Sequence, residues 1–255
     1  GKLKVQDICK RFCKYGMGDI HVYIGEMLGY PQERILNGSA RDFTEIDIKS
    51  LSVMMTENSY PETHIRSGIL DEEFIRGKVP MTKSEIRSLV ISKLGIAPSD
   101  IVWDIGCGTG SVSVEMALQC YKGTVYSIDL NPEAIELTKQ NALKFRCDNI
   151  DISLGSAPEI TEHFLTPDKI FIGGSNGNLQ DIISTAIRRN PKVIILITAV
   201  SLETIYEAMN GLSEHDFNVA ITQASITRTK QIACHSMRSA QNPVFIIRGY
   251  PKCKD

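Results

Sequence analysis

The segment "IVWDIGCGTGSVSVEMA" (residues 101–117) decides the fold class, because it joins an apolar strand to a helix through a turn with alternating glycines. Gly106, Gly108 and Gly110 occupy every second position, whereas a dinucleotide-binding turn places its third glycine five positions after its first. No Gly-Lys-Ser/Thr triplet follows, so the turn is not a Walker-type phosphate loop either. The glycine spacing therefore favours a ligand other than a phosphate.

Outward from this turn, short β-branched runs alternate with helical stretches such as "NPEAIELTKQNALKF". This alternation predicts an α/β fold with a doubly wound, mostly parallel sheet. The link between the last two runs is poorly helical, so we expect the final strand to be antiparallel at the edge of the sheet. The predicted strands cover residues 101–106, 124–129, 150–155, 169–174, 192–200, 218–227 and 243–250.

The chain divides by pattern into a small N-terminal α/β fragment (1–58), a proline-containing linker (59–80) and a main domain (81–250). The fragment is expected to have a helix, two strands and an intervening turn, over residues 5–16, 19–28, 51–57 and 29–35. These elements are too few to bury a proper core. The main domain begins with a predicted helix over 81–96, in which Thr82 and Glu85 have capping-box spacing.

Composition excludes several classes of protein. The longest apolar run, residues 193–200, is far shorter than the roughly 20 residues needed to span a bilayer. The N-terminus has no signal-peptide core, and the 7 scattered cysteines suit a reducing compartment, so we expect a soluble cytoplasmic protein. Cys9 and Cys13 alone do not make a zinc site, and no metal is expected. The net charge of −2 argues against a nucleic-acid partner.

Two aspartates indicate the kind of ligand. Asp104 precedes the first glycine by two residues, where a carboxylate would repel a pyrophosphate and attract a cationic group. Asp129 ends the next strand, where such sheets usually offer an acid to both hydroxyls of a ribose. A ribose with a cationic tail describes S-adenosylmethionine. The pattern D-x-G-x-G-x-G between strand and helix resembles the class I methyltransferases, whose seven-stranded sheet has an antiparallel last strand.

A narrower resemblance rests on "VPMTKSEIRSL", "WDIGCGTGSVSVE", "VYSIDLNPEAIEL", "IFIGGSNGNLQDII", "ITAVSLETIYEA" and "NPVFI". Together they resemble the carbon-15 methyltransferases (decarboxylating) of cobalamin biosynthesis, which act on precorrin-6Y or its cobalt form, over about residues 64–250. Upstream, "IGEMLGYPQERILNGSARDF" and "LSVMMTE" resemble the last part of the carbon-5 methyltransferase fused ahead of that domain in bifunctional enzymes. Its own glycine-rich turns are absent here, so carbon-5 activity is not expected.

The resemblance implies S-adenosylmethionine as the cofactor and a homo-oligomer, a tetramer in the family. It also implies that the acceptor carbon of the electron-rich macrocycle attacks the methyl group directly, so no catalytic acid or base is named. Ser156 stands where relatives often have an acid, and a backbone contact there would survive the change. By position, the implied cofactor site comprises Thr82, Gly106, Cys107, Gly108, Thr109, Gly110, Asp129, Ser156 and Ala157, to which the charge argument adds Asp104.

The implied substrate carries many carboxylates, which calls for a cationic side of the cleft. From Phe217 to Lys254 the chain has no Asp or Glu, yet it has several arginines and lysines. We therefore expect Arg228, helped by Lys230, to bind substrate carboxylates. Gly174 and Ser175 follow the fourth strand and should face the same cleft, because ligands bind beyond the carboxyl ends of parallel strands.

Other functions remain open at this point. A class I methyltransferase could act on another small molecule, on RNA or on protein, although the chain lacks a basic field and has "IGGSNG" where amino-group methylating enzymes have an N-P-P-Y type motif. A nicotinamide-dependent oxidoreductase is opposed by the glycine spacing. A catalytically inert partner or scaffold left from the fusion would be distinguished by a binding titration with S-adenosylmethionine.

Overall fold

The computed structural model describes residues 3–49, 51–59, 67–232 and 234–252, and it divides the chain into two compact units. One unit comprises Gly1–Ile65 with Leu143–Asp148, and the other comprises Arg66–Ala142 with Asn149–Asp255. Part of the predicted linker, residues 60–66, lies outside the described ranges, as does Lys254. The two units are therefore described separately.

The N-terminal unit is an antiparallel three-stranded sheet with one helix. Strand β1 lies between β2 and β3, and its burial alternates along the strand so that Val22 and Ile24 face inward. The elements are α1 (Val5–Lys14), β1 (His21–Glu26), β2 (Arg34–Ser39), the 3₁₀ helix η1 (Ala40–Phe43) and β3 (Ser52–Glu57). The unit buries its own small cluster, formed by Val5, Cys9, Val22, Ile24, Ala40, Phe43 and Ile48.

Strand β2 was not expected, because the turn predicted for 29–35 runs directly into it. The chain reverses where Met27 and Gly29 adopt positive φ, and β2 begins at Arg34. Its sequence contains Asn and Gly, which are poor strand formers, so propensity alone does not reveal it. Pairing with β1 along its whole length supplies the missing stabilisation.

The larger unit contains the predicted seven-stranded sheet, in the order β6-β5-β4-β7-β8-β12-β9. The first six of its strands along the chain are parallel, and the last is antiparallel to both of its neighbours. Its strands are β4 (Ile101–Ile105), β5 (Thr124–Asp129), β6 (Ile150–Leu154), β7 (Lys169–Ile172), β8 (Ile194–Ala199), β9 (Phe217–Ala224) and β12 (Val244–Pro251).

The position expected for the last strand was wrong. Strand β12 lies between β8 and β9, and β9 forms the edge of the sheet. Inside the sheet β12 has hydrogen-bonding partners on both sides, and its central residues Ile246 and Ile247 are fully buried. An edge position would have left one row of its backbone groups unpaired.

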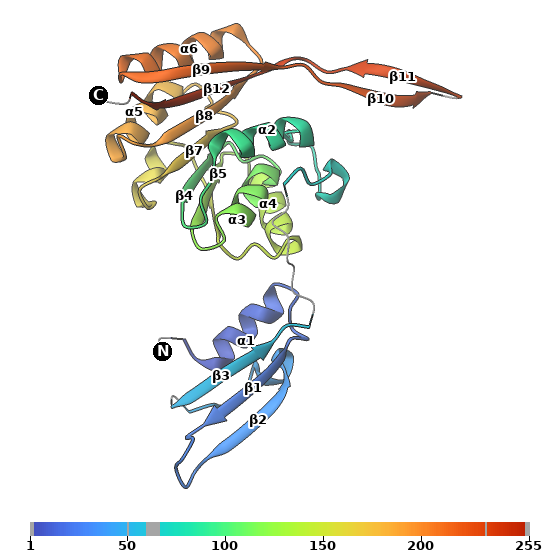
Figure 1. Ribbon diagram of the computed structural model, residues 1–255, viewed down its shortest axis with the longest axis vertical. Helices are drawn as coiled ribbons and strands as arrows, with labels where there is room; N and C mark the ends of the chain where they lie inside the picture. The colour runs from blue at the N-terminus through green and yellow to red at the C-terminus, as the bar shows by residue number, and fades with distance from the viewer. Residues whose placement is uncertain (1–2, 50, 60–66, 233, 253–255) are drawn as a thin grey trace. The chain divides into compact units, whose positions relative to one another are not determined.

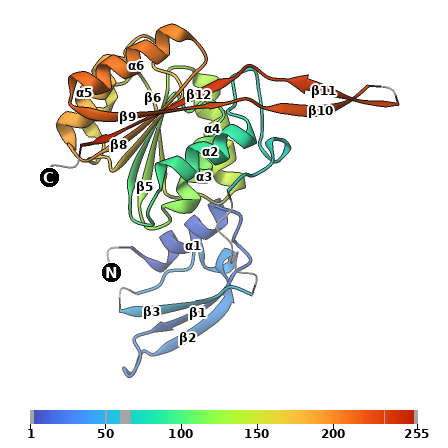
Figure 2. The ribbon, with the colours of Figure 1, turned by 45° about the horizontal axis from the view of Figure 1, so that its top comes forward.

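Helices cover both faces of the sheet, with α2, α3 and α4 on one face and α5 and α6 on the other (Figures 1 and 2). The helices are α2 (Ser84–Leu94), α3 (Ser111–Gln119), α4 (Pro132–Lys144), α5 (Leu179–Arg189) and α6 (Leu202–Glu214), with short 3₁₀ helices η2 (Asp71–Glu73) and η3 (Glu159–His163). None of the helices among the described residues is both long and apolar enough to cross a membrane.

The capping box expected at Thr82 and Glu85 is absent. Helix α2 starts at Ser84, after Lys83, with no side-chain cap from within the helix. The amide of Ser84 instead donates to Asp71, 2.9 Å away, so the carboxylate at this helix start comes from the preceding 3₁₀ helix η2.

A two-stranded hairpin leaves the sheet between β9 and β12. Strands β10 (Thr227–Ile232) and β11 (His235–Ala240) pair with each other and with no other described strand. The hairpin extends away from the sheet in both views (Figures 1 and 2). All of β11 is exposed to solvent. The link is non-helical as expected, but its strand pairing was not anticipated.

Candidate functional site

A pocket of about 470 Å³ opens where the parallel strands end, as the fold class requires. Its wall is built from the turns that follow β4, β5, β6 and β7, together with the segment before α2 and one residue of α5. The lining residues are Pro80, Thr82, Ile105, Gly106, Cys107, Gly108, Ile128, Asp129, Leu130, Asn131, Gly155, Ser156, Ala157, Gly173, Gly174, Ser175, Asn176 and Ile182.

The glycine turn after β4 has no room for side chains at two positions. A Cβ atom at Gly106 would lie 2.7 Å from the backbone nitrogen and oxygen of Gly174, in the turn after β7. A Cβ atom at Gly108 would lie 2.6 Å from the carbonyl oxygen of Pro80. Both residues also have positive φ, which L side chains rarely adopt. Neighbouring backbone occupies the places of these two side chains, so the glycines contribute only backbone to the pocket wall.

Asp129 stands at the end of β5 with its carboxylate held in place. Its Oδ2 accepts a hydrogen bond from the amide of Gly108, and its Oδ1 accepts one from the amide of Asn131, both at 2.9 Å. A carboxylate has about four acceptor sites, so each oxygen can still accept one more hydrogen bond. The side chain lines the pocket and is thus ready to receive two hydroxyl donors.

Most residues expected at the site lie in the pocket wall. They are Thr82, Gly106, Cys107, Gly108, Asp129, Ser156, Ala157, Gly174 and Ser175. Thr109 and Gly110 do not line it: Thr109 is buried with its carbonyl bound by Asn141, and Gly110 packs against Thr138. Leu130 lines the pocket but was not anticipated, although it directly follows a predicted strand.

Asp104 does not reach the pocket. It is fully buried, its Oδ2 accepts a hydrogen bond from the Ser113 hydroxyl, and its Oδ1 has no hydrogen-bond partner among the described residues. Burial raises the pKa of Asp104 to about 7, against the opposing effect of Ser113, and the charge of Asp129 adds to the rise. The expectation that Asp104 meets a cationic ligand is therefore wrong, because the side chain is turned toward α3.

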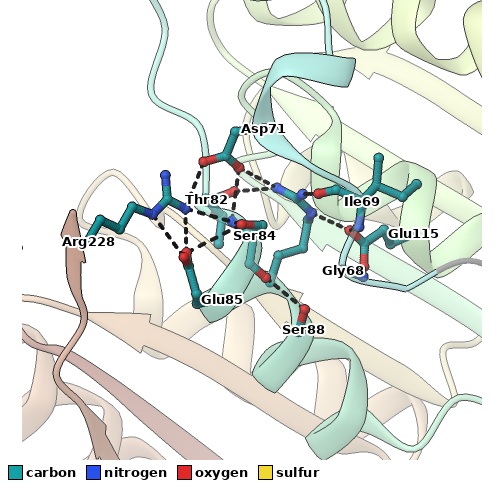
Figure 3. Close-up of polar contacts among 10 residues, drawn as sticks. Gly68, Ile69, Asp71, Thr82, Ser84, Glu85, Ser88, Glu115 and Arg228 are labelled. Carbon is teal, nitrogen blue, oxygen red and sulfur yellow. Dashed lines mark hydrogen bonds and ion pairs between the residues drawn. The ribbon is translucent and has the colours of Figure 1, made fainter. Parts of the chain in front are cut away.

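Arg228 is already neutralised within the chain. Its Nε donates to Glu85 at 2.9 Å, and its Nη2 donates to Asp71 at 3.0 Å and to the Ser84 hydroxyl at 3.1 Å (Figure 3). It does not line the pocket, and neither does Lys230, which is exposed on β10. These counter-ions come from 143 and 157 residues earlier in the chain and were not anticipated. The binding of substrate carboxylates by Arg228 stays a prediction.

Comparison with known proteins shows which family the chain belongs to. A model described as a precorrin methyltransferase domain matches residues 73–248, which include nearly all of the larger unit. The chain belongs to the precorrin methyltransferase domain family.

Relatives in this family are similar over most of their own length. A protein of Pyrobaculum calidifontis, named as a cobalt-precorrin-6B C(15)-methyltransferase (decarboxylating), is 41% identical over 186 residues, which cover 72% of this chain and 95% of the relative. A relative of the same name from Methanocaldococcus jannaschii is 39% identical over 182 residues, which cover 71% of this chain and 97% of the relative.

Solved structures agree with the family and the fold. A precorrin-6y C5,15-methyltransferase from Geobacter metallireducens has a TM-score of 0.69 at 33% identity, covering 75% of this chain and all of that one. A precorrin 8w decarboxylase from Methanobacterium thermoautotrophicum has a TM-score of 0.68 at 37% identity, covering 71% and 98%. A SAM-dependent O-methyltransferase from Thermotoga maritima, at 12% identity and a TM-score of 0.59, shares the fold alone.

The contact beneath the glycine turn predicts that Gly106→Ala is more destabilising than Gly177→Ala. Both glycines have positive φ, but a Cβ atom at Gly177 meets nothing within 4 Å. The control should cost about 1–2 kcal/mol from the left-handed backbone alone. The Gly106 variant should cost about 1–3 kcal/mol more because of overpacking. Urea unfolding measures both, and equal losses would contradict the contact.

The buried Asp104 predicts a pH-dependent stability. Its folded pKa of about 7 lies above that of an unfolded aspartate, so between about pH 4 and pH 7 the folded state holds the extra proton and stability falls as pH rises. Asp104→Asn removes this loss, so its stability relative to wild type should grow by about 2–4 kcal/mol across that window and then level off.

Thermal or urea unfolding at a series of pH values measures this difference. Ser113→Ala, which removes the hydrogen bond that favours the charged carboxylate, should extend the fall to higher pH. A stability difference between wild type and Asp104→Asn that stays constant from pH 4 to pH 8 would show that Asp104 is ionised throughout.

Proposed function

We propose that this chain transfers a methyl group from S-adenosylmethionine to carbon 15 of a precorrin-6-type tetrapyrrole, metal-free or cobalt-bound, with loss of the carbon-12 acetate carboxyl as carbon dioxide. The proposal is based on one observation: the glycine turn after β4 and the carboxylate of Asp129 line the same pocket. The names of relatives about 40% identical supply the substrate class.

The pocket residues fit this cofactor. Asp129 retains acceptor capacity for both ribose hydroxyls, and Gly106 and Gly108 line the pocket with backbone alone. Leu130 and Ala157 offer apolar surface in the same wall for the adenine. When bound, S-adenosylmethionine supplies a methyl group already activated by its sulfonium charge.

The chain's own residues act by position rather than by proton transfer. Asp129 is the only carboxylate among the described lining residues, and two backbone amides already bind it. Burial raises the pKa of the Cys107 thiol well above its usual range, so this thiol stays protonated and cannot serve as a base. An electron-rich acceptor carbon needs alignment and exclusion of water above all. We accordingly assign no catalytic acid or base.

The substrate side of the pocket is proposed to lie at the turn after β7. Gly174 and Ser175 are in the pocket wall, and a Cβ atom at Gly174 would meet nothing within 4 Å, so there is open space above this residue. The cofactor side lies across the pocket at Asp129. A flat macrocycle could therefore lie against Gly174 without a clash with a side chain at that position.

The N-terminal unit is proposed to be the terminal part of a carbon-5 methyltransferase domain, as in the fused bifunctional enzymes. It has its own buried cluster, and every lining residue of the described pocket belongs to the other unit. We therefore assign it no role in methyl transfer at carbon 15.

We also propose that the protein is a cytoplasmic homo-oligomer whose subunits meet through the β10–β11 hairpin. An isolated two-stranded hairpin is marginally stable in water. This one exposes all of β11, including Met237 with 52% of its surface accessible, and it pairs with no other described strand. A second copy of the chain would supply the missing packing.

The proposed assembly predicts that shortening the hairpin changes the mass of the particle. Replacing residues 229–238 by a two-residue Asn-Gly turn keeps Arg228 and its ion pairs. This variant should run as a smaller species than wild type in sedimentation or light scattering, while it still binds S-adenosylmethionine. An unchanged mass would place the contacts between subunits elsewhere.

The proposed reaction predicts that the full chain, incubated with precorrin-6Y or its cobalt form and S-adenosylmethionine, yields a product with one added methyl group and one carbon dioxide lost, detected by mass spectrometry. Asp129→Ala should weaken S-adenosylmethionine by at least roughly tenfold in calorimetry, since charge-assisted hydrogen bonds contribute about 1.5–3 kcal/mol each. Asp151→Ala, an exposed change on β6, is the control.

Two results would count against this assignment. Cofactor binding without any mass change in the tetrapyrrole would leave an inert scaffold or another acceptor. An unchanged dissociation constant in Asp129→Ala would remove this carboxylate from the cofactor site.

A further inference from the structure

A fully buried arginine stands beside the pocket without lining it. Arg87, in the first half of α2, has no exposed surface, and neither has Glu115 of α3, whose Oε1 accepts a hydrogen bond from Arg87 Nε at 2.5 Å. The guanidinium also donates to the carbonyl oxygen of Ile69 and lies 4.7 Å from the centre of the Phe74 ring. Figure 3 draws the polar contacts of this region and labels Ile69, Thr82 and Glu115, which come from different segments of the chain.

One contact of Arg87 leads to the pocket wall. Its Nη1 donates to the carbonyl oxygen of Thr82 at 2.7 Å. Thr82 and Pro80 both line the pocket, and the Pro80 carbonyl is the group that a Cβ atom at Gly108 would strike. Residues 80–82 therefore form a strap that closes over the glycine turn, and Arg87 holds one end of it.

The remaining acceptors fix the guanidinium itself. Glu115 also accepts hydrogen bonds from the amides of Gly68 and Ile69, at 2.9 and 3.1 Å. Asp71 faces Arg87 at 3.4 Å and binds the Ser84 amide and Arg228. Every part of this cluster is thus bound to backbone or to an opposite charge.

Burying such a cluster is costly compared with an apolar side chain of similar volume. A leucine or methionine at position 87 could fill the space, but neither could donate to the Thr82 carbonyl. The planar fork of an arginine reaches Thr82, Ile69 and Glu115 at once, which a lysine ammonium on its single stem cannot do.

We propose that Arg87 is a positioning residue for the cofactor. Through the Thr82 carbonyl it holds the 80–82 strap against the glycine turn, so cofactor binding and the Arg87 cluster stabilise each other. The identity of the ligand rests on the proposed function. The contact itself goes beyond that function, because Arg87 touches no ligand and acts only through the strap.

The first test compares Arg87→Lys with Arg189→Lys in the full chain. Arg189 is half-buried and serves as the control. Like Arg87 it donates to backbone carbonyl oxygens, those of Thr161 and Phe164, and lies over an aromatic ring, that of Trp103, yet none of these residues lines the pocket. In folded protein, Arg87→Lys should raise the dissociation constant for S-adenosylmethionine at least tenfold, and Arg189→Lys should change it less than twofold.

Kinetics separate positioning from general damage. With the tetrapyrrole as substrate, Arg87→Lys should raise KM for S-adenosylmethionine at least tenfold and leave kcat at saturating cofactor within about threefold of wild type, because the strap acts on binding. A variant that loses stability but keeps wild-type affinity and KM would show that Arg87 is only structural, and the inference would be overturned.

A second measurement needs no variant. The amides of Gly68 and Ile69 donate to Glu115 and do not line the pocket, so saturating S-adenosylmethionine should slow their hydrogen exchange at least fivefold in wild type. The amide of Ala97, which donates to Asp100, serves as the control. If Arg87→Lys does not fold, hydrogen exchange at Gly68 and Ile69 in the wild-type protein tests the inference by itself.

The two failures are distinguishable. Unchanged exchange at Gly68 and Ile69, in wild-type protein shown by calorimetry to be saturated with cofactor, overturns the inference and leaves the proposed function standing. Wild-type protein that binds no S-adenosylmethionine overturns both.

Discussion

The larger unit depends on one place where two backbones touch. The turns after β4 and β7 meet at Gly106 and Gly174 with no space for a methyl group between them. This contact keeps two neighbouring strand ends together. Two residues further along the turn, the amide of Gly108 donates a hydrogen bond to Asp129. The two turns can approach this closely only because residue 106 has no side chain.

Much of the fold could be predicted because buried parallel strands have a strong local signal. Apolar runs such as "VIILITAV" and the helical stretches between them place the seven strands of the large sheet to within a few residues. The neighbours of β12 could not be predicted, since the choice between an edge and an internal position depends on partners far away in the chain. The β10–β11 hairpin was missed because its strands are polar and its turn has no Asn-Gly or Asp-Gly signal.

The candidate site divides in the same way. The glycines and Asp129 were found because they lie at the ends of neighbouring parallel strands, where the topology places a ligand. Asp104 was misplaced because spacing alone does not show that its side chain turns toward Ser113, nine residues later in α3. The ion pairs of Arg228 could not be foreseen because Asp71 and Glu85 are 157 and 143 residues away in the sequence. A sequence segment without Asp or Glu can still contact carboxylates from other segments in the folded protein, as Arg228 does.

The internal position of β12 has a consequence for synthesis on the ribosome. Strand β9 pairs with β12 and with no other described strand, so it cannot join the sheet until the last eight-residue strand, Val244–Pro251, has emerged. Until then a nascent chain presents the open side of β8, an unpaired edge of mostly apolar residues that can associate with other chains. Strand β12 thus completes the sheet and pairs the backbone groups of β8 that would otherwise be exposed.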